Sequence, residues 1–148
     1  MPSITPSYVY TLFACMIVGT MLVCAFSVSA LEVKNEADQQ QIRNLTTYLA
    51  AKSCELVSFK GTSNLRSECS LSVPGFVGNK QYWVQLTNDS NQAWVNVGFG
   101  TIPGSTDCRV PVPVKLAASG TYASGSGPLV LKCRSVGPAL YLELSEGT

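Results

Sequence analysis

The chain has 148 residues, with ten Lys or Arg and nine Asp or Glu, so its formal net charge is +1. The basic residues are scattered singly from Lys34 to Arg134, and this pattern does not favour a nucleic-acid partner. The sequence contains no histidine, which removes the commonest general base and the commonest metal ligand. No carboxylate pair or metal-ligand spacing stands out either. We therefore expect no catalytic residue, no metal and no cofactor.

The first 30 residues contain no charged side chain, and the first one is Glu32. From Tyr8 to Leu31 the segment is apolar apart from a few hydroxyl groups, which a helix can bond to its own carbonyls. About 20 apolar residues are enough for a helix to cross a bilayer. We predict a helix that either spans a membrane or forms the dry centre of a helical filament.

A cleaved signal peptide is the alternative for this segment, and Val28-Ser29-Ala30 resembles a small-residue cleavage site. However, no basic residue precedes the apolar run, and the run is longer than the roughly 7–15 residues usual in such signals. We therefore favour a helix that stays part of the protein.

The helix is predicted to continue to about residue 59, because residues 31–59 contain no Gly or Pro. Its second part carries two stripes about 150° apart. The first is apolar: Ile42, Leu45, Leu49 and Leu56. The second is made of small residues: Thr47, Ala50, Ala51, Cys54, Val57 and Ser58. We expect one stripe to pack on the chain's own domain and the other on something else, or both to be sunk in a large core. Residues 32–41 are polar on all sides and are predicted to form a solvated joint.

After Gly61 the apolar residues alternate, which predicts strands. Residues 80–86 and 93–99 flank Asn88-Asp89-Ser90-Asn91 and should form a hairpin. Other strands are expected near residues 69–73, 109–114, 129–133 and 140–144, with 109–114 at a sheet edge because it holds two prolines. Residues 119–128 are interpreted as turn-rich. The predicted fold class is α+β: a long N-terminal helix, about residues 5–59, followed by an antiparallel β-sandwich-like domain.

Trp83 and Trp94 fall on the outward face of this hairpin, opposite Val84 and Val95. We expect the two indoles to lie on the same side, close enough for a cross-strand contact. Two tryptophans on an otherwise polar face need cover. Either the chain's own helix or a loop covers them, or they contact a neighbouring subunit.

Four cysteines lie outside the apolar segment: Cys54, Cys69, Cys108 and Cys133. Without His or a Cys-x-x-Cys pair, this set suits two disulfides better than zinc, with buried free thiols as the alternative. Strand parity favours Cys108–Cys133, which would leave Cys54–Cys69, although other pairings stay open. Disulfides would place the domain outside the cytoplasm.

Two sequons, at Asn44 and Asn88, agree with an exported domain. Asn88 is the better candidate for glycosylation because it lies at a predicted hairpin tip, whereas Asn44 lies on the helix between the two stripes.

An apolar helical half, a second helical half with two faces and a C-terminal β-domain together resemble a type IV pilin. Ile4-Thr5-Pro6 is similar to the Ile-Ser-Pro start of the archaeal branch of that superfamily. In this family the apolar helix waits in the cytoplasmic membrane and then packs with its copies as the filament core, with the β-domains outside. A family precursor carries Lys or Arg and then Gly before its processing site. Here only MPSI precedes the run, so a leader is absent from this sequence or the protein stays in the membrane.

The resemblance implies three parts: residues 1–31 as membrane and filament-core helix, 32–60 as its continuation on the β-domain, and 61–148 as an extracellular β-domain. The expected function is a structural, adhesive subunit of a cell-surface filament. Its partners would be its own copies, the membrane before assembly, and surface glycans or envelope proteins. The candidate subunit contacts are Tyr8, Leu12, Met16, Gly19, Leu22, Ile42, Leu45, Leu49, Trp83 and Trp94. The alternatives are a membrane-anchored domain that binds the cell envelope, like an archaellum stator protein, and an anchored enzyme or sugar-binding domain.

Overall fold

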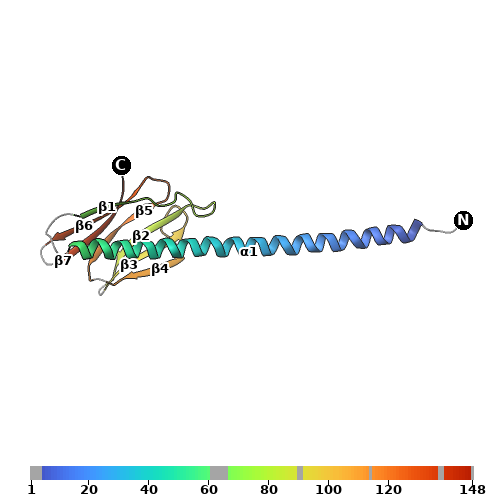
Figure 1. Ribbon diagram of the computed structural model, residues 1–148, viewed down its shortest axis with the longest axis horizontal. Helices are drawn as coiled ribbons and strands as arrows, with labels where there is room; N and C mark the ends of the chain where they lie inside the picture. Colours follow the sequence, from blue (N-terminus) through green and yellow to red (C-terminus); the bar gives the residue numbers. More distant parts are fainter. Residues whose placement is uncertain (1–4, 61–66, 90–91, 114, 137–138, 148) are drawn as a thin grey trace. The chain divides into compact units, whose positions relative to one another are not determined.

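A computed structural model describes residues 5–60, 67–89, 92–113, 115–136 and 139–147. In these residues one helix is followed by seven strands, so the α+β class is confirmed (Figure 1). The elements are α1 (Thr5–Lys60), β1 (Ser67–Leu71), β2 (Tyr82–Asn88), β3 (Ala93–Phe99), β4 (Cys108–Val112), β5 (Ala117–Ala123), β6 (Leu129–Val136) and β7 (Ala139–Glu146). The chain divides into two compact units, Met1–Ala37 and Asp38–Thr148, which are described separately.

The first unit is helical from Thr5 onwards. Pro6 falls in the first turn, where its missing N–H breaks no helical hydrogen bond. The Thr20 hydroxyl donates to the Met16 carbonyl at 3.0 Å, and the Ser27 hydroxyl donates to the Val23 carbonyl at 2.8 Å. The hydroxyls of Thr20 and Ser27 are thus satisfied inside the helix. The predicted lead-in at residues 1–4 lies outside the described residues.

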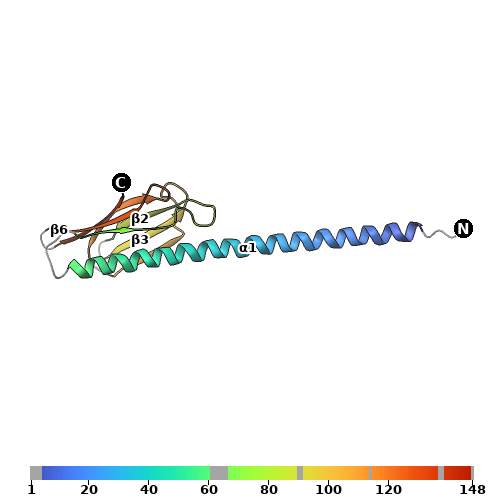
Figure 2. The ribbon, with the colours of Figure 1, turned by 45° about the horizontal axis from the view of Figure 1, so that its top comes forward.

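The second unit contains one seven-stranded sheet in the order β1-β6-β7-β5-β2-β3-β4, in which only β5 and β7 run parallel. Residues 38–60 of α1 lie along one face of this sheet (Figure 2). The expected sandwich is therefore a single sheet with a helix as its second layer. The helix supplies the apolar cover that a second sheet would have given.

The sheet changes partners in the middle of β5. Residues 117–120 of β5 pair with β7, whereas residues 120–123 pair with β2, so Gly120 belongs to both ladders. Gly120 has a φ of +127°, and a Cβ atom there would overlap the backbone of Leu144. Only glycine fits this position without strain. Reading residues 119–128 as turns was thus wrong for their first part, because β5 is a central strand.

The core lies between the sheet and one side of the helix. Ile42, Leu45 and Leu49 are buried there, as the first stripe predicted. The second stripe divides: Ala50 and Val57 are also buried, while the remaining positions are not. Exposed or half-buried members of that stripe are Thr47, Ala51, Cys54 and Ser58. Only one side of this helical part is covered by the domain.

The predicted β2–β3 hairpin is confirmed, with Tyr82 opposite Phe99 and Asn88 opposite Ala93. The Asp89 amide donates to the Gln92 carbonyl at 2.9 Å, and the middle of the turn, residues 90–91, lies outside the described residues. The edge position of β4 is confirmed as well, since β4 ends the strand order.

Candidate assembly and binding surfaces

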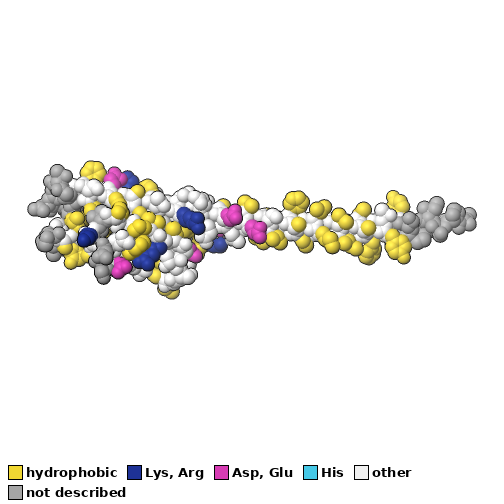
Figure 3. All heavy atoms as spheres, turned by 90° about the horizontal axis from the view of Figure 1, so that it is seen from below, with side chains coloured by type: hydrophobic (Ala, Val, Ile, Leu, Met, Phe, Trp, Pro, Cys, Tyr) yellow, Lys and Arg dark blue, Asp and Glu magenta, His cyan; other side chains and the backbone are white. Residues whose placement is uncertain are grey.

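The apolar segment of α1 is exposed on all sides within its own unit. Predicted contact residues Tyr8, Leu12, Met16 and Leu22 are between 51% and 75% exposed, and Gly19 is half-buried. Figure 3 shows hydrophobic side chains all along this part of the helix. The segment is long and apolar enough to cross a membrane, judged by length and composition.

Leaving this surface in water is costly. Fifteen large apolar side chains from Tyr8 to Val33 are at least half exposed. Covering one such side chain contributes about 1.5 kcal/mol or more, so covering all of them is worth on the order of 20 kcal/mol. Because the Thr20 and Ser27 hydroxyls are bonded internally, this surface can leave water without stranding them. Lipid or other protein surfaces are the environments that suit it.

Four predicted contact positions in the second unit are not available to another subunit. Ile42, Leu45 and Leu49 are no more than 8% exposed and pack in the chain's own core. Trp83 is 1% exposed. The prediction that Ile42, Leu45 and Leu49 contact another subunit was wrong. An apolar stripe looks the same in the sequence whether the chain's own sheet or a partner covers it.

Trp83 is covered by the loop that joins β3 to β4. A Cβ atom on Gly98 would meet both the Trp83 ring and the Ser105 carbonyl, so this loop passes directly over the indole. The expected contact between the two tryptophans is also wrong. Trp83 lies opposite Gly98 and Trp94 opposite Thr87, which separates them by four positions, roughly 13 Å along the strands. Their location on one face, opposite Val84 and Val95, is as expected.

Trp94 remains half-buried and is covered by a charged side chain. The Arg109 guanidinium carbon lies 4.0 Å from the centroid of the Trp94 ring. Arg109 is exposed and stands directly opposite Asn96, the next outward residue of β3. The sequence placed Trp94 outward, but the identity of its cover depends on the β3–β4 register, which no local pattern specifies.

A buried carboxylate marks the start of the second unit. Asp38 is 4% exposed, and its Oδ2 lies 3.4 Å from Lys80 Nζ. Gly78, at a φ of +62°, packs so closely on Asp38 that a Cβ atom would overlap the carboxylate. The Lys80 ammonium also lies 5.0 Å from the centre of the Phe99 ring. The solvated joint predicted for residues 32–41 therefore ends at Asp38, which ties the helix to the β1–β2 loop.

The six cysteines all lie in described residues, and no disulfide joins any of them. Cys108 and Cys133 do face the same side, but four strands separate β4 from β6. Six strands span roughly 24 Å, far more than the roughly 4.4–6.8 Å between the Cα atoms of a disulfide. Cys69 faces the side of α1 that carries Lys52 and Leu56, and Cys54 lies nearly opposite that side. The predicted pairs Cys108–Cys133 and Cys54–Cys69 are thus corrected to thiols, and burial raises the pKa of Cys54.

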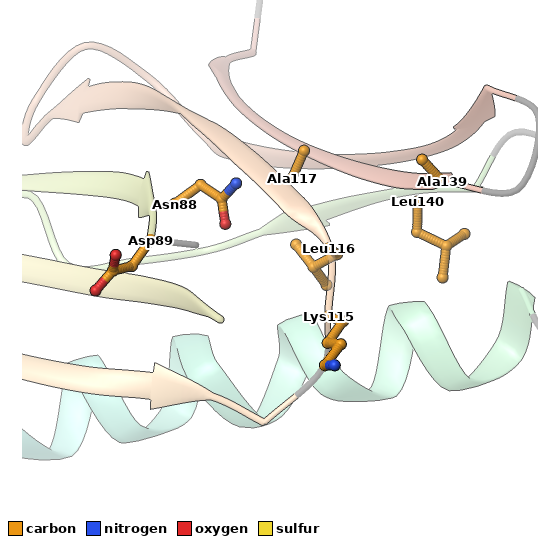
Figure 4. Close-up of a pocket in the computed structure, with 7 residues that line it drawn as sticks. All are labelled: Asn88, Asp89, Lys115, Leu116, Ala117, Ala139 and Leu140. Carbon is orange, nitrogen blue, oxygen red and sulfur yellow. The ribbon is translucent and has the colours of Figure 1, made fainter. Parts of the chain in front are cut away.

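Both sequon asparagines are exposed. Asn44 accepts a hydrogen bond from the Gln40 amide at 3.3 Å, and Asn88 ends β2. Asn88 lines an open cavity of about 210 Å³ at the place where β2 and β5 separate (Figure 4). In that view Lys115, Leu116 and Ala117 lie between Asn88 and the start of β7. Glycosylation at Asn88 remains a prediction, and Ser90 of its sequon lies outside the described residues.

In the described part of the chain, no group of three or more His, Cys, Asp or Glu side chains is arranged to hold a metal ion. The surfaces with distinctive chemistry are therefore the apolar segment of the first unit and the Trp94–Arg109 stack of the second. Comparisons with protein families, with curated proteins and with solved structures find no match for this chain.

Proposed function

We propose that this protein is a structural subunit of an extracellular helical filament of the type IV pilus kind, with a role in adhesion. The observation that carries the proposal is the first unit: a helical segment with about 15 large apolar side chains exposed in every direction. A lone anchor helix is surrounded by lipid and needs the same apolar character on every side. A filament-core helix needs it toward lipid before assembly and toward its copies afterwards.

The second unit supports the same function through what it leaves exposed. Its own core is closed by Ile42, Leu49 and the inner face of the sheet. The uncovered side of α1 carries the small residues Thr47, Ala51 and Ser58, and the hydroxyls of Thr47 and Ser58 donate to the helix backbone. Small side chains allow neighbouring helices to approach closely.

The alternative is a membrane-anchored outward-facing β-domain that binds the cell envelope, like an archaellum stator protein. It uses the same apolar helix, which is suited in length and composition to crossing a membrane. It differs in needing few copies and a distinct partner. Material sheared from cells separates the two functions, because a filament subunit appears there in quantity and an anchored protein stays with the membranes.

The sharpest experiment substitutes Gly19→Leu. Nothing lies within 4 Å of a Cβ atom at Gly19 in the isolated chain, so the larger residue fits the monomer and keeps the segment apolar. Close packing between copies would be obstructed. We expect membrane insertion to persist and filaments, viewed by electron microscopy of sheared material, to be lost.

The matched control is Val18→Leu, at a neighbouring position that is already 56% exposed and occupied by a bulky side chain. It should insert and assemble like the parent chain. If the parent chain itself yields no filaments and stays monomeric in detergent, the filament function is refuted and the anchored domain is favoured.

A further inference from the structure

Besides the Trp83 indole N–H on β2, two buried polar groups on the outer face of β3 have no hydrogen-bond partner in the described structure. They are the Trp94 indole N–H and the Asn96 side-chain carbonyl, two positions apart on β3. Asn96 is only 8% exposed, and its amide nitrogen donates to Thr87 Oγ1 at 2.9 Å. A buried donor or acceptor without a partner is destabilising because it loses its bonds to water, so such a pair needs an explanation.

The side chain beside this pair is Arg109, a cation with no carboxylate partner among the described residues. Among the described residues Lys52, Lys80 and Lys132 each have a carboxylate within 4 Å, whereas Arg109, like Arg134, makes no ion pair. Arg109 is held over the Trp94 ring by a cation–π contact, which is a weak interaction at an exposed site. So weak a contact allows Arg109 to move aside and expose the face of the Trp94 ring.

We propose that Trp94, Asn96 and Arg109 form a binding site for an acidic sugar, a saccharide ring that carries a carboxylate. The guanidinium would bind the carboxylate through two parallel hydrogen bonds. The indole N–H would donate to a ring or hydroxyl oxygen, the Asn96 carbonyl would accept from a hydroxyl, and the indole face would pack on the C–H groups of the sugar. The proposal extends the adhesive role of the proposed function by naming its ligand class and rests on that function for its surface location.

The combination of groups distinguishes this ligand from others. A simple inorganic anion would use Arg109 and leave the Asn96 carbonyl, an acceptor, still unpartnered. A neutral sugar would use the indole and the amide but leave the cation unpaired. Only a ligand with hydroxyl donors, an oxygen acceptor and a carboxylate satisfies all three side chains.

The test uses the full chain dispersed in detergent micelles, with isothermal titration calorimetry as the readout. A trisaccharide that contains glucuronic acid is titrated against the matching neutral glucose trisaccharide. We expect the acidic probe to bind roughly tenfold or more tightly than the neutral one, because a hydrogen bond to a charged group is worth about 1.5–3 kcal/mol. Arg109→Gln should abolish this preference, and Trp94→Phe, which removes the N–H and keeps a ring, should weaken both probes.

Arg134→Gln is the control, since Arg134 is an exposed arginine on the same outer face but on β6. It should bind both probes like the parent chain, and thermal unfolding of each variant should confirm that it is folded. Equal binding of the two probes, no binding at millimolar concentration, or an equal loss in Arg134→Gln would overturn the proposal. The proposal would also be overturned if neither probe binds and Arg109→Gln fails to form filaments, because Arg109 would then be a subunit contact. Binding is measured on dispersed protein, so failure of filament assembly in the parent chain is a separate result.

Discussion

Gly120→Ala should be the most damaging single-atom change in the β-domain. The residue has a φ of +127°, where a side chain adds about 1–3 kcal/mol of backbone strain. A Cβ atom would also overlap the backbone of Leu144, the partner of Gly120 on β7, and overpacking of this kind costs about 1–3 kcal/mol. Together these predict a loss of about 2–6 kcal/mol in the free energy of unfolding, a large share of the stability of a small domain.

Urea unfolding of the full chain in a mild detergent measures this loss. Both tryptophans lie in the β-domain, so fluorescence reports on that unit. Gly125→Ala is the matched control: its φ is +90°, but a Cβ atom there would meet nothing within 4 Å, so it should lose only the strain contribution. If Gly120→Ala loses no more stability than Gly125→Ala, the close approach of β5 to β7 is refuted.

Three further outcomes follow from buried groups. Lys80→Met should lose about 2 kcal/mol in urea unfolding, because it leaves the 4%-exposed Asp38 without its cation while the half-exposed lysine limits the effect. Leu49→Ala should lose about 2–5 kcal/mol, whereas Leu22→Ala should change stability by less than about 0.5 kcal/mol and weaken filament assembly instead. Burial raises the pKa of Tyr82, so above the phenol's ordinary pKa of about 10 only the unfolded chain loses the proton. Stability should therefore be constant below that pH and fall above it. Tyr82→Phe should reduce this alkaline decline, and an unchanged slope would contradict the prediction.

The elements that the sequence predicted well are those whose signal is local. The helix over residues 5–59 follows from the lack of interior breakers, and the β2–β3 hairpin follows from alternation around a polar turn. β5 was missed because Gly120 and the serines around it are typical of turns. Glycine is needed there for the approach of β7, a strand about 20 residues further along the chain, and no local pattern reports such a contact.

Contacts between strands that are distant in the chain could not be predicted either, because no local pattern reports them. Parity correctly placed Cys108 and Cys133 on the inner face, but parity carries no information on strand order, which separates them by four strands. Trp94 was placed outward correctly, whereas its neighbours Asn96 and Arg109 were not recognised as a group. Their proximity depends on β4 pairing with β3 in one register.

The change in character along α1 has a simple physical basis in the proposed function. A helix satisfies its backbone hydrogen bonds internally, so it can pass from lipid to a protein environment without breaking them. The transfer then concerns side chains alone, and it is cheap only where every side is apolar and the hydroxyls of Thr20 and Ser27 are already bonded. These conditions end at Glu32, the first charged residue, which is followed by Lys34 and Glu36. In the proposed function Glu32 therefore sets the limit of the segment that can exchange a membrane for other copies of the chain, and the buried Asp38 beside Lys80 begins the part that packs on the β-domain.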